Sequence, residues 1–161
     1  MGVRFTGPDL VALALEIERN GAAFYEACLS RDNGERASRV FRFMLGEERK
    51  HVQQFQELES LLKGIENLGK PMSDEEQQYL TALATSNIFT AEGTGEEMAE
   101  MAEDAEEALE LAMQFEKDSV LFYSEFLNFV TEAARPVVEE ILRQEKVHIS
   151  QLAELRAFLE S

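Results

Sequence analysis

Hydrophobic residues recur every three to four positions along most of this chain, which is the period of an α-helix. In the first such segment, Leu10, Leu13, Ile17 and Phe24 fall on one face of a helix. Turn residues and helix caps separate this segment from the later ones. The pattern therefore predicts four long helices and, third in order, one short helix, at about residues 8–29, 35–63, 73–85, 103–130 and 136–159.

Short motifs mark the ends of these helices. Arg31-Asp32-Asn33-Gly34 is a turn by composition, so the first two helices should be antiparallel neighbours. Ser73-Asp74-Glu75-Glu76 has the form of a capping box, in which the Ser and Glu side chains satisfy free N–H groups where a helix begins. Pro136 suits the first turn of the last helix. Residues 64–72 have the composition of a linker, and residues 86–95 are predicted to be irregular.

The order of these elements predicts the architecture. Two helical hairpins, at about residues 8–63 and 103–160, are joined by a connection of about residues 64–102 that contains the short helix. A long connection after the second helix allows the chain to cross to the opposite end of a bundle. We therefore predict a single all-α domain over residues 1–161, built as a four-helix bundle of two antiparallel hairpins with a crossover.

Composition and charge narrow the class of protein. The chain has 161 residues, of which 45% are hydrophobic and 29% charged, and this is typical of a globular domain with a substantial core. Its formal net charge of −17 argues against binding nucleic acid or an anionic membrane surface, since both need clusters of Lys and Arg. No apolar stretch approaches the ~20 residues of a membrane span. We therefore expect neither nucleic acid nor a membrane as a partner.

Cysteine usage indicates a reducing compartment. Cys28 is the only cysteine, so the chain can form no internal disulfide. The absence of a Cys-x-x-Cys pair excludes a rubredoxin-type iron centre and a zinc ribbon within this chain. The opening residues lack the apolar core of a signal peptide. We expect a cytoplasmic protein.

One constellation of residues with metal-binding chemistry occurs twice. In each half of the chain a glutamate is followed seven positions later by a tyrosine, and later still by a Glu-x-x-His. Matching members of the two series lie 98 or 97 residues apart. Such a constant offset indicates an internal duplication that builds one site from two similar halves. The two series are Glu18, Tyr25, Glu48 and His51, then Glu116, Tyr123, Glu145 and His148.

The spacing suits a site that holds two metal ions. Residues three apart on a helix lie on neighbouring parts of one face, so each Glu-x-x-His can direct two side chains at one point. Glu18 and Glu116 can approach that point from the other two helices. One Glu from each of two helices and a Glu-x-x-His from each of two others form the ligand set of a carboxylate-bridged two-metal site. Four carboxylates and two neutral imidazoles carry a charge of −4, which balances two divalent cations.

The ligand types favour particular metals. Imidazole together with carboxylate suits iron or manganese, whereas an all-oxygen set suits calcium or magnesium and structural zinc prefers Cys and His. We expect two iron ions, with manganese as the second choice. Two adjacent irons can together supply two electrons, so such a site can reduce O2 or peroxide.

Several residues beside the constellation have two interpretations. Tyr25 and Tyr123 are either core aromatics or hydrogen-bond donors to a ligating carboxylate. Gly21 and Ser119, each three positions after a proposed ligand, either leave room for O2 or peroxide or allow close helix packing. We expect solvated faces for Glu47, Glu139 and Glu140, and core positions for Phe115, Phe122, Phe126 and Phe129.

The chain resembles the ferritin-like di-iron superfamily, and within it the rubrerythrin group, at residues 14–25, 48–51, 112–123 and 145–148. The resemblance covers all four long helices but not the connection. It implies a ferritin-like four-helix bundle in which two of the six ligands, Glu48 and Glu145, bridge the metals. Rubrerythrins reduce hydrogen peroxide to water with electrons delivered through a rubredoxin domain. The full ligand set implied by the resemblance is Glu18, Glu48, His51, Glu116, Glu145 and His148.

The chain departs from the rubrerythrin pattern in two respects. It has no rubredoxin-like cysteines, so electrons must come from a separate donor such as a rubredoxin-like protein. Rubrerythrins also carry an extra ligating Glu close to the ligand on the third long helix. Here Met113 and Ser119 occupy the positions three before and three after Glu116. The ligand exchange and the strong peroxidase activity attributed to that extra Glu are therefore not implied for this chain.

Three functions stay open at this point. The first is a di-iron oxidoreductase that consumes peroxide or O2 in oxidative stress. The second is a ferroxidase or other iron-handling protein, which oxidises Fe(II) and stores it or passes it on. The third is a non-enzymatic helical bundle with a structural metal site. Storage needs a closed shell of many subunits, whereas we expect a homodimer.

Overall fold

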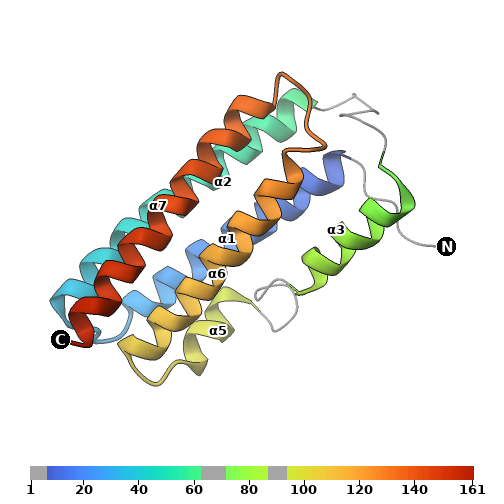
Figure 1. The fold of residues 1–161 in the computed structure, drawn as a ribbon. Helices are drawn as coiled ribbons and strands as arrows, with labels where there is room; N and C mark the ends of the chain where they lie inside the picture. Colours follow the sequence, from blue (N-terminus) through green and yellow to red (C-terminus); the bar gives the residue numbers. More distant parts are fainter. Residues whose placement is uncertain (1–6, 63–71, 87–93) are drawn as a thin grey trace.

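The computed structural model describes residues 7–62, 72–86 and 94–161, and within these ranges its regular structure is entirely helical (Figure 1). Of the helices in the described ranges, four long ones form the bundle and two shorter ones belong to the connection. The all-α architecture is therefore confirmed. The helices are α1 (Gly7–Leu29), α2 (Gly34–Leu62), α3 (Asp74–Ser86), α5 (Gly95–Met101), α6 (Ala105–Phe126) and α7 (Arg135–Leu159).

The bundle consists of two antiparallel hairpins, α1 with α2 and α6 with α7 (Figure 1). Helix α2 ends at one end of the bundle and α6 begins near the other, so the connection that contains α3 and α5 runs along the bundle's length. This arrangement confirms the predicted crossover. It makes α1 antiparallel to α6 as well as to α2. Within the described ranges, no helix has both the length and the hydropathy needed to cross a membrane.

Local sequence explains how the helices begin. At the turn before α2, the buried Asn33 amide donates to the Cys28 carbonyl at 2.6 Å, and Gly34 adopts a φ of 73° that glycine tolerates without strain. Ser73 and Glu76 form the predicted capping box at the start of α3. Asp104 caps α6 by accepting from two backbone N–H groups. Pro136 lies in the first turn of α7, as predicted.

The sequence analysis missed one helix and misplaced the end of another. Helix α5 was not predicted, although Thr94 and Glu97 form a complete capping box in front of it, a signal present in the sequence. Helix α6 ends at Phe126 instead of about residue 130. Beyond it, the Phe129 N–H donates to the Phe126 carbonyl in a shorter turn bond, and the Arg135 guanidinium donates to the Leu127 carbonyl at 3.1 Å. Most of the predicted linker, residues 64–72, and of the irregular stretch, residues 86–95, lies outside the described residues.

Aromatic side chains fill the interior of the bundle. All four phenylalanines of the run in and after α6 are buried, which confirms their predicted core positions. They meet buried aromatic and aliphatic residues of α1, α2 and α7 in one continuous core. This apolar packing surrounds the centre of the bundle and excludes water from it.

Close packing of α5 on α1 generates a stability prediction. A Cβ atom added at Gly95 would lie 1.8 Å from the Asn20 carbonyl oxygen, whereas one added at the exposed Gly46 would meet nothing within 4 Å. We expect Gly95→Ala to destabilise the protein by about 1–3 kcal/mol, as overpacking does. Gly46→Ala, in the interior of α2, should stabilise by about 0.5–1 kcal/mol. Urea denaturation of both variants tests this, and a Gly95→Ala protein as stable as the parent would contradict the packing.

Candidate metal centre

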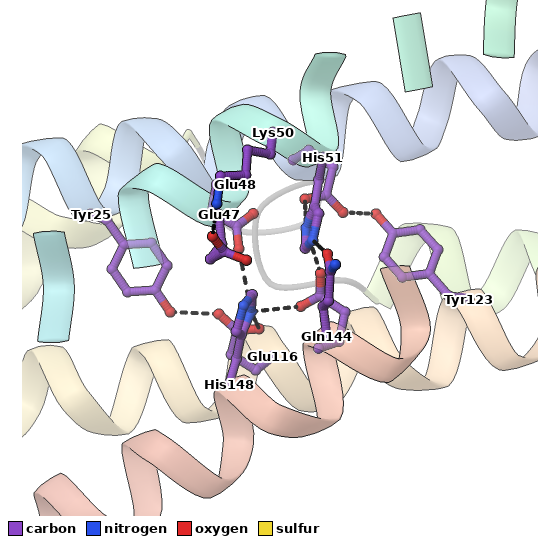
Figure 2. A network of polar contacts seen from close by, with 11 residues as sticks. Tyr25, Glu47, Glu48, Lys50, His51, Glu116, Tyr123, Gln144 and His148 are labelled. Atoms are coloured by element: carbon purple, nitrogen blue, oxygen red, sulfur yellow. Dashed lines mark hydrogen bonds and ion pairs between the residues drawn. The ribbon is translucent and has the colours of Figure 1, made fainter. Parts of the chain in front are cut away.

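All six proposed ligands meet in the middle of the bundle (Figure 2). Helices α1 and α6 each contribute one glutamate, and α2 and α7 each contribute one Glu-x-x-His. Each of the six side chains comes from a residue that is at most 1% exposed. The structure therefore brings together the residues that the repeat singled out, which are Glu18, Glu48, His51, Glu116, Glu145 and His148.

The six residues divide into two overlapping groups of possible metal ligands. In each group the potential ligand atoms lie within 4.8 Å of one another. Glu48 and Glu145 belong to both groups. If each group held one ion, these two carboxylates could contact both ions. The His51 group adds Glu18 and His51 to this shared pair, and the His148 group adds Glu116 and His148.

The shared glutamates leave their oxygens without hydrogen-bond partners. Both carboxylate oxygens of Glu48 and both of Glu145 are buried and accept no hydrogen bond from any residue that the structure describes. Nδ1 of His51 lies 2.8 Å from Oε1 of Glu145, but without the alignment of a hydrogen bond. Buried carboxylate oxygens without partners are costly in a folded protein. Because two divalent cations would satisfy these four oxygens and neutralise the four carboxylates, the residues present fit a pair of metal ions.

Each histidine faces the carboxylates through the same ring nitrogen. Nδ1 of His51 lies 3.1 Å from Oε2 of Glu18, and Nδ1 of His148 lies 3.3 Å from Oε2 of Glu116. The two imidazoles stack, with their ring centres 5.6 Å apart and their planes 26° from parallel. Both Nδ1 atoms are therefore placed where a metal ion would meet a carboxylate and an imidazole together.

Each tyrosine donates a hydrogen bond across the repeat. The Tyr25 hydroxyl donates to Oε1 of Glu116 at 2.6 Å, and the Tyr123 hydroxyl donates to Oε1 of Glu18 (Figure 2). Seven residues of helix separate each tyrosine from the glutamate of its own series by about 10 Å, too far for a direct contact. Because α1 and α6 are antiparallel, each tyrosine instead lies level with the glutamate of the other half. Both tyrosines are thus core residues and donors to proposed ligands.

Burial and neighbouring charge keep these tyrosines protonated. Burial, then the charges of Glu116 and Glu48, raise the pKa of Tyr25 well above its ordinary value. Burial and the charge of Glu18 do the same to the pKa of Tyr123. A protonated phenol can donate, so both tyrosines can hold their glutamates over the physiological pH range.

Three of the carboxyl groups, those of Glu48, Glu116 and Glu145, and both imidazoles have shifted pKa values in the absence of metal. Burial and then the charges of Glu18 and Glu145 raise the pKa of Glu48 well above its ordinary value, and burial with the Glu145 charge raises that of Glu116 to about 8. Burial lowers the pKa values of the histidines, but their carboxylate neighbours outweigh this effect. They raise the pKa of His51 to about 11 and that of His148 to about 10. For Glu145, the effect of burial is outweighed by the close ring nitrogens of His148 and His51, which lower its pKa.

The positions of Gly21 and Ser119 favour different interpretations. A Cβ atom at Gly21 would lie 2.6 Å from both Oε2 of Glu48 and the ring of Phe115. Existing side chains fill that space, so Gly21 allows close packing and does not leave room for a substrate. Ser119 is 1% exposed, and its hydroxyl has no hydrogen-bond partner among the described residues. Ser119 therefore leaves a free buried hydroxyl one turn after the proposed ligand Glu116.

The predicted solvated faces hold for two of the three glutamates concerned. The side chains of Glu139 and Glu140 are 55% and 44% exposed. Glu47 was predicted wrongly, because its side chain is only 13% exposed and pairs with Lys50. Its position next to Glu48 at the helix interface accounts for this burial. The sequence analysis also did not identify the contact between the side chains of Gln144 and His51. The available signal was that Gln144 occupies the position of the repeat that matches Glu47.

Comparison with known proteins supports the fold. No model of a known protein family matches the chain, and no curated protein matches it. Among solved structures, the chain is similar to one from Thermotoga maritima that is proposed to be a ferritin-like diiron-carboxylate protein. The two share 22% sequence identity, the match covers 98% of each chain, and the TM-score is 0.68. The chain therefore has the ferritin-like fold that its sequence predicted.

Loss of either histidine should weaken metal binding. We expect His51→Ala and His148→Ala each to lower affinity for Fe(II) at least 10-fold, since even changes outside the ligand shell commonly cost 10–100-fold. Gln53→Ala, at an exposed position of α2, serves as the control and should bind as the parent does. Anaerobic titration with metal analysis gives the stoichiometry, which should be two ions per parent chain. A double histidine variant that binds iron as well as the parent would show that the ligands lie elsewhere.

The metal-free protein should become less stable as the pH rises. Glu48 and Glu116 have raised folded-state pKa values, so native stability falls as pH rises from the ordinary 4.5 through about 8 for Glu116. The two histidines also have raised pKa values, so their protonation stabilises the folded state fully below pH 6.5. This contribution is lost as the pH rises through about 10 to 11. Both effects have the same sign, so the melting temperature should fall between about pH 5.5 and about pH 9.

Two comparisons isolate this pH effect. Glu48→Gln should flatten the pH dependence of the metal-free protein, whereas Glu139→Gln, which removes an exposed carboxylate from α7, should leave it unchanged. Metal-loaded protein should instead gain stability with pH, because the ligands must be deprotonated to bind. A metal-free protein whose melting temperature rises over this range would contradict the burial of these groups.

Proposed function

We propose that this protein is a di-iron oxidoreductase that reduces hydrogen peroxide, or O2, at the buried carboxylate and histidine cluster. The observation that supports this most directly is the group of four unpartnered oxygens on Glu48 and Glu145. A purely structural cluster would satisfy these oxygens with donors from the protein. The similar Thermotoga maritima structure is also described as a diiron-carboxylate protein.

Iron is the metal that we propose, with manganese as the second choice. Both suit a mixture of carboxylate and imidazole ligands. Glu48 and Glu145 would be shared by the two ions, and their membership of both groups supports this proposal. The remaining ligand pairs would each complete one metal position.

The reaction breaks the O–O bond of hydrogen peroxide and consumes two electrons and two protons to give two molecules of water. Two ferrous ions bound in the cluster would supply those two electrons. Tyr25 and Tyr123 hold Glu116 and Glu18 in place through their hydroxyl groups. The surrounding buried aromatic side chains exclude bulk water from the cluster. The ring of Phe43, 45% exposed, meets His148 edge-on and separates this side of the cluster from solvent.

Continued turnover requires that electrons be returned to the cluster after each reaction. The chain's single cysteine, Cys28, cannot form a four-cysteine iron centre. We propose a one-electron donor of the rubredoxin type as the partner, and a homodimer as the oligomeric state. Without that donor, the reaction should stop after a single oxidation of the bound iron.

Stopped-flow absorbance of the anaerobically loaded diferrous protein tests the reaction. We expect oxidation by hydrogen peroxide to be faster than oxidation by O2 at matched concentration, with continued turnover only when a reduced donor is added. His51→Ala loaded under the same conditions is the control, and it should lose the fast phase.

Other outcomes assign other functions. An O2 rate that equals or exceeds the peroxide rate would place the protein among the ferroxidases. Oxidation by neither reagent would leave a structural metal site. Either result would overturn the peroxide assignment without changing the evidence for a two-metal cluster.

A further inference from the structure

The residue that precedes each shared glutamate breaks the symmetry of the repeat. It is Glu47 in the first half and Gln144 in the second, 97 residues apart. Oε1 of Gln144 lies 2.7 Å from Nε2 of His51 (Figure 2). The Glu47 carboxylate pairs with Lys50 instead, and over the described residues it makes no hydrogen bond to His148. The two histidines therefore have different environments beyond the cluster.

Hydrogen bonds from outside the cluster hold Gln144 in one orientation. Its amide nitrogen donates to Oε1 of Glu140 at 2.8 Å, and Glu140 accepts two hydrogen bonds from Arg143 at 2.6 and 2.9 Å. The bonds from Arg143 lower the pKa of Glu140 to about 2, so this group is a carboxylate that can only accept. The amide nitrogen of Gln144 must therefore face Glu140, and its oxygen must face His51.

This orientation selects one form of the His51 ring. An amide oxygen can only accept, so a neutral His51 must carry its proton on Nε2. Nδ1 is then the nitrogen with the free lone pair, and it faces Glu18 at 3.1 Å and Glu145 at 2.8 Å. This is the form in which an imidazole binds a metal through Nδ1, with its other nitrogen held by an acceptor. Groups outside the cluster thus orient the His51 ring for metal binding through Nδ1.

Over the residues that the structure describes, the first half of the repeat has no equivalent chain of hydrogen bonds. Phe43 and Gly46 occupy the positions that match Glu140 and Arg143, again 97 residues apart. The Phe43 ring lies 6.2 Å from the His148 ring at an interplanar angle of 88°. Among the described residues, no acceptor fixes Nε2 of His148. An aromatic contact therefore replaces the polar one, and the ring of His148 is less constrained.

Given that the cluster holds two metal ions, as the proposed function requires, we propose that Gln144 is a positioning residue that makes the two metal positions unequal. The position in the His51 group fills first and binds more tightly, because its imidazole is already oriented. The position in the His148 group fills second and exchanges its ion faster, because binding there must also order the ring. Glu140 and Arg143 act through Gln144.

Anaerobic titration of the metal-free protein with Co(II) tests this order without any redox chemistry. Visible absorption and calorimetry should resolve two binding steps whose affinities differ by about 10-fold or more. Crystals grown with one equivalent of Co(II) should show anomalous scattering mainly in the His51 group. Equal occupancy of the two positions at one equivalent would overturn the proposal.

Variants at matched positions identify the residue responsible. Gln144→Leu should weaken the first binding step about 10–100-fold and change the second by less than about 3-fold. A general loss of folding would instead weaken both steps and lower the melting temperature of the metal-free protein. Glu47→Gln, the control at the matched position, should change neither step by more than about 3-fold.

An exchange of the two polar residues tests the hydrogen bond itself. The double variant Glu140→Gln with Gln144→Glu keeps the net charge and keeps an acceptor facing His51. It should therefore bind the first Co(II) ion as tightly as the parent does, in contrast to Gln144→Leu. Failure to restore it, or an unchanged binding order in Gln144→Leu, would contradict the role of Gln144. Absence of Co(II) binding would overturn this proposal together with the two-metal site. Ordered binding without oxidation by peroxide or O2 would overturn only the proposed function.

Discussion

The burial of four carboxyl groups and two imidazoles at the centre of one small bundle is the constraint on which the rest of this structure depends. Isolated buried charges are costly, so each must be protonated, paired or bound to a cation. Glu18 and Glu116 are partly satisfied by tyrosine hydroxyls. Within the described part of the chain, no group donates a hydrogen bond to the side chain of Glu48 or Glu145. The fold therefore concentrates buried carboxylate oxygens without hydrogen-bond partners at one point, on the two glutamates that both groups share.

The helices and their packing serve to maintain that point. Antiparallel α1 and α6 bring each tyrosine level with the opposite glutamate, and the Glu-x-x-His spacing directs two side chains inward from α2 and from α7. Phenylalanines pack around this polar centre and keep water away. Gly21 shows how tight the packing is, because even a methyl group there would displace Glu48 or Phe115. The polar cluster and the apolar core thus depend on the same close approach of helices.

Much of this arrangement could be predicted from the sequence, because it follows from helical periodicity and from a repeated spacing. The six clustered residues and the crossover are examples. Helix α5 was missed, although Thr94 and Glu97 carried its signal. The tyrosine pairing across the repeat and the contact between Gln144 and His51 depend on the relative height and rotation of separate helices. Periodicity within one helix contains no information about either quantity.

The crossed tyrosine contacts have a consequence for ancestry. Tyr25 reaches the opposite half exactly as its counterpart does, so two identical copies of one hairpin, related by a twofold axis, could make the same contacts with each other. Such a symmetric dimer must carry the same residue at both equivalent places. When the copies are joined in a single chain, one place can hold Glu47 and the other Gln144. Fusion of the two copies thus permits what a symmetric dimer forbids, which is that the two halves of the cluster evolve separately.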